Sequence, residues 1–291
     1  MIFFNPLSYN VGKMRRIFLV PNAVTAFSLA CGLFVIFKIN MIEPGSGGYE
    51  VILTSTLLLL VAAVADFMDG ALARVFHAES DFGFMFDSLA DAVTFGVAPS
   101  VLFLKSVSLE QGTVLSFLAA TGAMVYSLCG VLRLVRFNVK KKQGTKEDLE
   151  AQKKNFTGLP IPAAAAGAVS ANLFFLSPVL PRFFEVSISV RAIILSIIML
   201  FLGYFMVSRW KFPSLKVLHF RIPSFHLAFL TVLLTIFVLY GILHYFSVVL
   251  AIISWAYILF ALLLSIIRLI SGKKSKTLKE FEPDPDEFDD N

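Results

Sequence analysis

The chain has little charge for its length. Of its 291 residues, 15% are charged and 57% are apolar, and the mean hydropathy is +0.81. Soluble domains carry far more charge than this. The composition therefore argues against a soluble enzyme and predicts a protein that lies mostly within a membrane.

Cysteine and histidine are also scarce, with two and four residues respectively. Cys31 and Cys129 lie in apolar stretches without a C-x-x-C pair, and the histidines do not cluster. This pattern excludes a disulfide scaffold and a zinc site, and it predicts that both cysteines pack as apolar residues. The chain also lacks a Walker loop, a serine-hydrolase elbow and any aromatic-basic motif typical of nucleic-acid binding.

Long apolar runs dominate what remains. Hydropathy predicts an all-α, polytopic transmembrane bundle, because each run is about as long as the ~20 residues that cross a bilayer as a helix. The first run lies too far into the chain, and lacks the cleavage-like site, of a removed signal peptide. The predicted spans are residues 20–38, 50–74, 87–104, 112–136, 158–178, 189–208, 226–243 and 247–268.

Lysine and arginine are distributed unevenly between the predicted loops. If both termini are cytoplasmic, 21 of the 25 cations lie on the cytoplasmic side. Positive residues favour that side of a membrane. The pI near 9.2 therefore reflects membrane topology, and we expect no nucleic-acid partner.

Four carboxylates fall inside the predicted membrane region, in the string Asp66-x2-Asp69-Gly70-x2-Ala73-Arg74-x8-Gly83-x3-Asp87-x3-Asp91. Each acid at bilayer depth costs about 2.5–3.5 kcal/mol, so the group needs a compensating partner. Residues three or four apart share a helix face, and only residues 77–82 separate the two predicted helices that carry the acidic pairs. We therefore expect an antiparallel helix hairpin whose four acids converge on one point.

Oxygen-only ligands favour Mg²⁺ or Mn²⁺ over zinc, and four acids suffice to bridge two metal ions of the kind used in phosphoryl transfer. The alternative is a proton or sodium relay in a transporter. A relay does not require small residues at fixed offsets. Gly70, Ala73 and Gly83 instead suggest a ligand that lies against the backbone.

The acidic string resembles the signature of the CDP-alcohol phosphotransferase family, D-x2-D-G-x2-A-R-x8-G-x3-D-x3-D, and matches every specified position. The resemblance implies transfer of a phosphoalcohol group from a CDP-linked donor to a hydroxyl, with release of CMP. It implies that Asp66, Asp69 and Asp87 hold one metal ion and that Asp66, Asp87 and Asp91 hold a second. Asp91 would also be the general base, and the displacement would be direct and in line.

The resemblance also assigns the CDP-lipid site. Gly70 and Ala73 would leave room for cytidine and ribose, Arg74 would bind phosphate, and Ser80 would offer a hydroxyl near Gly83. The segment Pro21-Asn22-Ala23-Val24-Thr25 is similar to the family's P-N-x-x-T, which brings Asn22 and Thr25 to the CDP moiety. The alternative for this pair is a helix start and a packed threonine.

Further segments resemble the phosphatidylserine synthase branch of that family: P-N-x-x-T-x6-C-G at residues 21–32, R-L-V-R-F-N at 133–138, F-T-G-L-P-I-P-A at 156–163 and M-V-S-R-W-K-F-P-S-L-K at 206–216. The branch implies CDP-diacylglycerol and L-serine as substrates. Arg133 and Arg136 could bind the serine carboxylate, although the positive-inside rule alone would also place them there. A sister activity on glycerol 3-phosphate or an inositol phosphate remains the alternative.

Four regions follow from these assignments. We expect an interfacial N-terminal segment (1–19), a six-span catalytic core (20–216), two additional spans (217–270) and a disordered acidic tail (271–291). The expected location is the inner membrane of a bacterium, with the active site and both termini facing the cytoplasm and membrane lipids as surroundings. The resemblance further implies a homodimer.

Overall fold

The computed structural model describes residues 6–42, 48–76, 80–107, 109–110, 112–143, 155–182, 184–208, 211–213 and 225–271. Almost all of these residues are helical, and the strands among them are two three-residue segments, β1 (Asn155–Thr157) and β2 (Lys211–Pro213). The predicted all-α membrane bundle is confirmed. The acidic tail beyond residue 271 and the loop at residues 144–154 lie outside the described residues.

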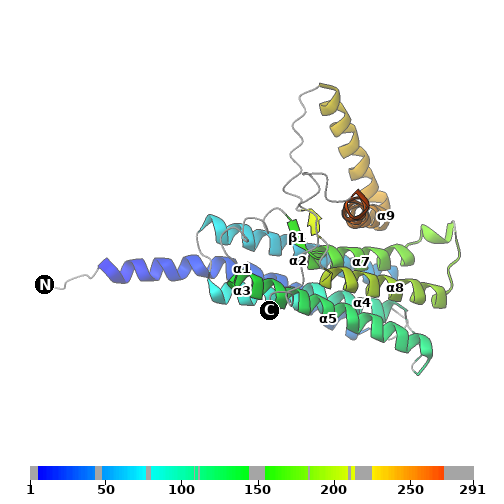
Figure 1. Ribbon diagram of the computed structural model, residues 1–291, viewed down its shortest axis with the longest axis horizontal. Coiled ribbons are helices and arrows are strands. Elements are labelled where there is room, and N and C mark those ends of the chain that lie inside the picture. Colours follow the sequence, from blue (N-terminus) through cyan, green and yellow to red (C-terminus); the bar gives the residue numbers. More distant parts are fainter. Residues whose placement is uncertain are drawn as a thin grey trace.

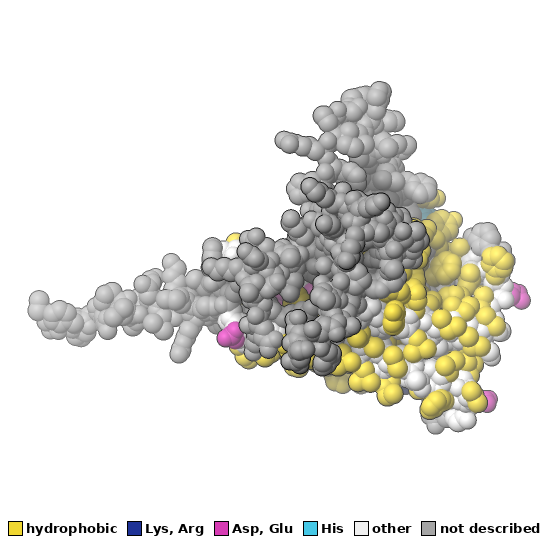
Figure 2. Space-filling view, in the orientation of Figure 1, with side chains coloured by type: hydrophobic (Ala, Val, Ile, Leu, Met, Phe, Trp, Pro, Cys, Tyr) yellow, Lys and Arg dark blue, Asp and Glu magenta, His cyan; other side chains and the backbone are white. Residues whose placement is uncertain are grey.

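The helices run roughly side by side along one long axis, apart from the C-terminal one (Figure 1). Six helical stretches of the described residues are long and apolar enough to cross a membrane. Figure 2 shows the corresponding hydrophobic surface over the bundle, with acidic side chains near its ends. The helices are α1 (Pro6–Asn40), α2 (Tyr49–Val75), α3 (Asp81–Asp91), η1 (Ala92–Val97), α4 (Ala98–Val107), α5 (Val114–Gln143), α7 (Ile161–Leu176), η2 (Leu180–Arg182), α8 (Ile188–Val207) and α9 (Phe225–Ser271).

Two helices begin earlier than hydropathy predicts. The first is a single helix from Pro6, continuous with the predicted first span, where we expected a separate interfacial segment. The third span begins at Asp81 and not at residue 87, because the Ser80 hydroxyl caps it by accepting a hydrogen bond of 3.0 Å from the Gly83 amide. Asp81, Asp87 and Asp91 lower the mean hydropathy of this stretch, so a hydropathy window misses its start.

The third span contains a π-helix, η1, directly after Asp91. The Ala98 amide bonds the Val93 carbonyl five residues back, which leaves other carbonyls of this turn to find new donors. The Tyr126 hydroxyl donates to the Phe95 carbonyl at 3.0 Å, and the Ser127 hydroxyl donates to the Gly96 carbonyl at 3.0 Å. Both donors come from α5, so α5 fixes the irregular turn that follows the last acid.

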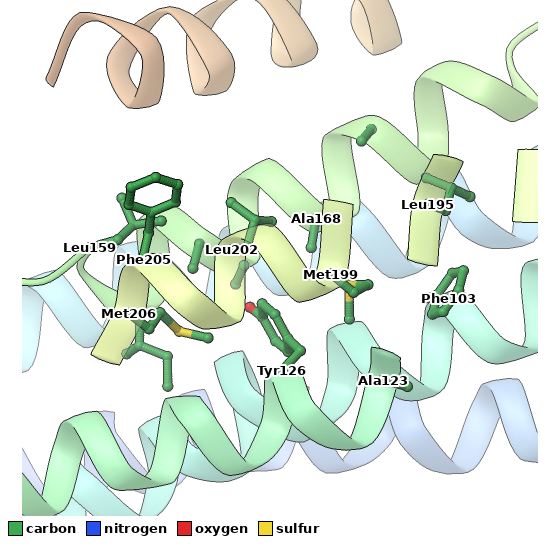
Figure 3. Close-up of a cluster of buried hydrophobic side chains, with 14 of the residues drawn as sticks. Phe103, Ala123, Tyr126, Leu159, Ala168, Leu195, Met199, Leu202, Phe205 and Met206 are labelled. Carbon is green, nitrogen blue, oxygen red and sulfur yellow. The ribbon is translucent and has the colours of Figure 1, made fainter. Parts of the chain in front are cut away.

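Small residues let the helices approach closely. α5 and α8 share the most extensive contact of the bundle, and a Cβ at Gly122 of α5 would lie 3.2 Å from the Ser196 carbonyl of α8. A Cβ at Gly32 of α1 would lie 2.5 Å from the Thr94 hydroxyl of η1. Membrane helices associate through such contacts because lipid supplies no hydrophobic driving force. Figure 3 shows the largest core, in which Tyr126 lies between α5 and α8.

The segment before α7 is fixed by the end of α8. β1 and β2 pair antiparallel, with Phe156 opposite Phe212, and the Leu159 amide donates to the Phe205 carbonyl at 2.9 Å. Gly158 has φ +76° and faces the Met206 carbonyl, so only glycine fits there without strain. The motif at residues 156–163 therefore has a structural role, which the sequence left open.

α9 contains the break predicted between the last two spans. Tyr245 departs from helical geometry (φ −135°, ψ 43°), and the two halves of α9 point in different directions (Figure 1). The second half packs against α7, where a Cβ at Gly167 would lie 2.8 Å from the Ile258 Cδ1 atom. It therefore belongs to the bundle.

Candidate active site

The four acids of the motif lie on two helices that pack poorly against each other. α1 packs along both α2 and α3, whereas α2 and α3 have little direct contact over their described residues. The predicted antiparallel hairpin is therefore wrong in its packing. The facing sides carry acids, which repel one another in apolar surroundings, so a third helix has to hold the pair together.

The acids nevertheless converge. Asp66 and Asp69 of α2 and Asp87 of α3 each offer a carboxylate oxygen within 4.8 Å of the other two. Asp69 is buried, at 4% exposure, and the other two are partly buried. An all-oxygen set of this size and charge fits a hard divalent cation such as Mg²⁺ or Mn²⁺.

Asp91 lies outside that group of three but touches it. Its carboxylate is within hydrogen-bonding reach of Asp66, and Asp66 also reaches Asp87. Asp91 also interacts electrostatically with Arg133 of α5, a partly buried cation. Asp91 thus has both carboxylates and a cation among its neighbours, and as a carboxylate it could accept a proton.

The P-N-x-x-T segment of α1 meets both acidic helices. The Thr25 hydroxyl contacts Oδ2 of Asp69 at 2.5 Å and the Pro21 carbonyl at 3.1 Å. A Cβ at Gly83 would lie 2.9 Å from Oδ1 of Asn22 and 3.1 Å from the Ser80 hydroxyl. The structure therefore brings Asn22, Ser80 and Gly83 close together. This is consistent with their common assignment to the CDP-lipid site.

The remaining predicted donor-binding residues lie at the end of α2. A Cβ at Gly70 would meet nothing within 4 Å, so this face of the helix is open. Arg74 is exposed, and its Nε donates to the Gly70 carbonyl at 2.9 Å, which lays the side chain along its own helix. Ala73 is half-buried on the same turn.

The structure separates the two arginines predicted to bind serine. Nη1 of Arg136 donates to the Val207 carbonyl at 3.2 Å and so ties α5 to the last turn of α8. Arg133 interacts electrostatically with Asp91, and its buried Nε has no hydrogen-bond partner among the described residues. Of the two arginines, Arg133 is the one that has an unsatisfied donor and interacts with an acid of the motif.

Sequence reasoning missed several residues around the site. Asn138 of α5 shares a 3.1 Å hydrogen bond with Ser88 of α3, beside Asp87, and Tyr257 of α9 interacts electrostatically with Arg133. Asn138 could have been proposed from the sequence, since it ends the R-L-V-R-F-N segment. No sequence pattern marks Tyr257, because it lies in a continuous apolar run.

Comparison with known proteins identifies the class. The model of the CDP-alcohol phosphatidyltransferase family matches residues 18–202, and the chain belongs to this family. The match confirms the resemblance found in the acidic motif. It covers every predicted site residue and ends before α9.

Several individual relatives share one name, CDP-diacylglycerol–serine O-phosphatidyltransferase. The protein of Bacillus subtilis is 34% identical over 197 residues, which is 68% of this chain and 91% of the relative. That of Methanocaldococcus jannaschii is 30% identical over 80% of this chain and 97% of the relative. One from Helicobacter pylori is 28% identical over 80% of this chain and 93% of the relative.

We expect Thr25 to set metal affinity through Asp69. Thr25→Val removes the hydroxyl that contacts Oδ2 of Asp69 while keeping the side-chain shape. Loss of such an outer partner typically weakens metal binding about 10–100-fold. The concentration of Mn²⁺ that gives half-maximal activity should rise accordingly, and Thr25→Ser should restore it. Equal Mn²⁺ titrations for wild type and Thr25→Val would contradict this role.

Gly70 offers a test of whether the open face of α2 holds the donor. Gly70→Ala should raise the thermal stability of the free protein slightly, because alanine favours a helix by about 1 kcal/mol and meets no neighbour. If the donor lies there, the KM for the CDP-linked substrate should rise at the same time. Gly48→Ala, at the N-cap of α2 and equally open, is the control for this KM and should leave it unchanged. An unchanged KM would place the donor elsewhere.

Proposed function

We propose that this chain is a phosphatidylserine synthase, which transfers the phosphatidyl group of CDP-diacylglycerol to L-serine. The observation that carries the proposal is the convergence of Asp66, Asp69 and Asp87 with Asp91 alongside, in a chain of this family. Relatives that align over most of this chain are named CDP-diacylglycerol–serine O-phosphatidyltransferase, which supports serine as the acceptor.

The acidic group would hold two divalent cations, Mg²⁺ or Mn²⁺. Asp66, Asp69 and Asp87 would bind one, and Asp66, Asp87 and Asp91 would bind the other. When bound, the cations would neutralise the donor pyrophosphate and the charge that develops on its leaving phosphate. Thr25 would hold Asp69 in place for this purpose.

The reaction follows from the position of Asp91. Its carboxylate takes the proton of the serine hydroxyl as that oxygen attacks the β-phosphorus of CDP-diacylglycerol. One P–O bond forms to serine, the P–O bond to the CMP phosphate breaks, and CMP leaves with the bonding electrons. Asn22, Gly70, Ala73, Arg74, Ser80 and Gly83 would bind the CDP-lipid.

The charge around Asp91 favours serine over the sister acceptors. Glycerol 3-phosphate and inositol phosphates bring a doubly charged phosphate and call for several cations. Among the described residues, Arg133 is the cation that interacts with Asp91, and Arg136 is bonded to the Val207 carbonyl. One guanidinium matches the single carboxylate of serine.

The proposal is tested by CMP release from CDP-diacylglycerol with purified protein and Mn²⁺ or Mg²⁺, screened across serine, glycerol 3-phosphate and inositol phosphate. Serine should support turnover, and chelator should abolish it.

Asp91→Asn should lower turnover by about 10²–10⁴-fold or more, the effect of a lost general base. Asp81→Asn, an exposed acid in the first turn of α3, is the control and should be nearly silent. Cation binding without any turnover of CDP-lipid would favour the transporter alternative.

We further propose that the active site and both termini face the cytoplasm of a bacterial inner membrane, on the strength of the lysine and arginine distribution. A cysteine at Val75, at the end of α2, should then react with a membrane-impermeant maleimide only from the cytoplasmic side. One at Glu185, before α8, should react only from outside. Both native cysteines are first replaced by alanine, and labelling of both positions from one side would refute the orientation.

The homodimer is proposed from the family resemblance alone. The mass of the protein in detergent, measured by light scattering with the detergent contribution subtracted, tests it. A mass of one chain, 32.2 kDa, would refute it.

A further inference from the structure

The second half of α9 is built into the catalytic bundle although it lies beyond the family match, which ends at residue 202. Ile258 and Ala261 are fully buried in the same core as Tyr126. Trp255 stacks on Phe201 of α8 with ring centroids 6.5 Å apart. These contacts fix the rotation of the helix, so the direction in which its other side chains point is set.

That rotation carries Tyr257 into the bundle. Tyr257 precedes Ile258 directly and lies one turn before Ala261, and it packs against the same core while remaining partly exposed. Its hydroxyl end interacts electrostatically with Arg133 of α5, which in turn interacts with Asp91. Tyr257 thereby connects α9, through Arg133, to Asp91.

The unsatisfied donor of Arg133 indicates that a ligand binds beside it. Its Nε is buried and has no hydrogen-bond partner among the described residues. Leaving a buried charged donor unsatisfied is costly, whereas a carboxylate can accept two parallel bonds from a guanidinium. A phenol hydroxyl beside it can donate a further bond to the same carboxylate.

We propose that Arg133 and Tyr257 together form the subsite for the carboxylate of the amino-acid acceptor, with Tyr257 as a specificity-determining residue. The proposal rests on the proposed function. The amino acid then spans the two groups: its carboxylate meets Arg133 and Tyr257, and its hydroxyl meets Asp91. The helix that lies outside the family match thus selects the acceptor.

The test is Tyr257→Phe, which removes the hydroxyl and keeps the ring. The serine KM should rise about 10–100-fold, as for a lost hydrogen bond to a charged group, while the KM for CDP-diacylglycerol stays unchanged. Tyr240→Phe is the matched control, since Tyr240 lies on α9 with 55% of its surface exposed and should keep the wild-type serine KM. Elution profile and melting temperature in detergent verify that each variant is folded.

Two further measurements separate the subsite from mere packing. Turnover of L-serinamide, which lacks the carboxylate, should be the same for wild type and Tyr257→Phe. In the double variant with Arg133→Lys, the two effects on serine KM should be less than multiplicative, because both residues bind one group.

The outcomes distinguish this inference from the proposed function. A wild-type protein that uses another acceptor and not serine refutes the function. A wild-type protein that uses serine, with an unchanged serine KM in Tyr257→Phe, refutes only the subsite. Equal losses with serine and serinamide also refute it, since they would assign Tyr257 to packing.

Discussion

Mutual repulsion among carboxylates in apolar surroundings is the constraint on which the rest of the structure depends. Asp66 reaches both Asp87 and Asp91, and Asp69 is buried beside them. Removing such charges from water costs several kcal/mol per ion unless each is paired or hydrogen-bonded. The constraint accounts for the small direct contact between α2 and α3, for the position of α1 against both, and for the interactions of Thr25 and Arg133 with the acids.

The rest of the bundle provides a frame for that group, in which close backbone contacts add to the apolar core. Close approaches at Gly32 and Gly122 bring backbones together, and hydroxyl groups then bond carbonyls of neighbouring helices. Ser28 of α1 donates to the Ala62 carbonyl of α2 at 3.0 Å, one turn before Asp66. Such bonds lock the helices in register. The helices that carry the acids are therefore positioned by close backbone contacts, and the Thr25 hydroxyl in turn contacts Asp69.

The sequence predicts the spans and the acids, because hydropathy and i, i+3/i+4 spacing are local properties. It predicts less well what depends on distant partners. The hairpin packing of α2 and α3 was wrong because the role of α1 is not encoded in their own periodicity. From the sequence alone Gly158 resembles any loop glycine, because its contact with the end of α8 depends on the fold. Tyr257 is one aromatic among many in α9, and only the fold shows that it interacts with Arg133.

The π-helix η1 separates the third span into two independently oriented faces. A regular helix would fix the direction of Ser100 once that of Asp91 is set, whereas the wider turn between them adds a phase shift. Asp91 can thus face the acids while Ser100 donates to the Ala123 carbonyl of α5 at 3.0 Å. Deleting one residue between 92 and 97 would rotate one face by about 100° against the other. The span is therefore intolerant of any change in the length of this turn.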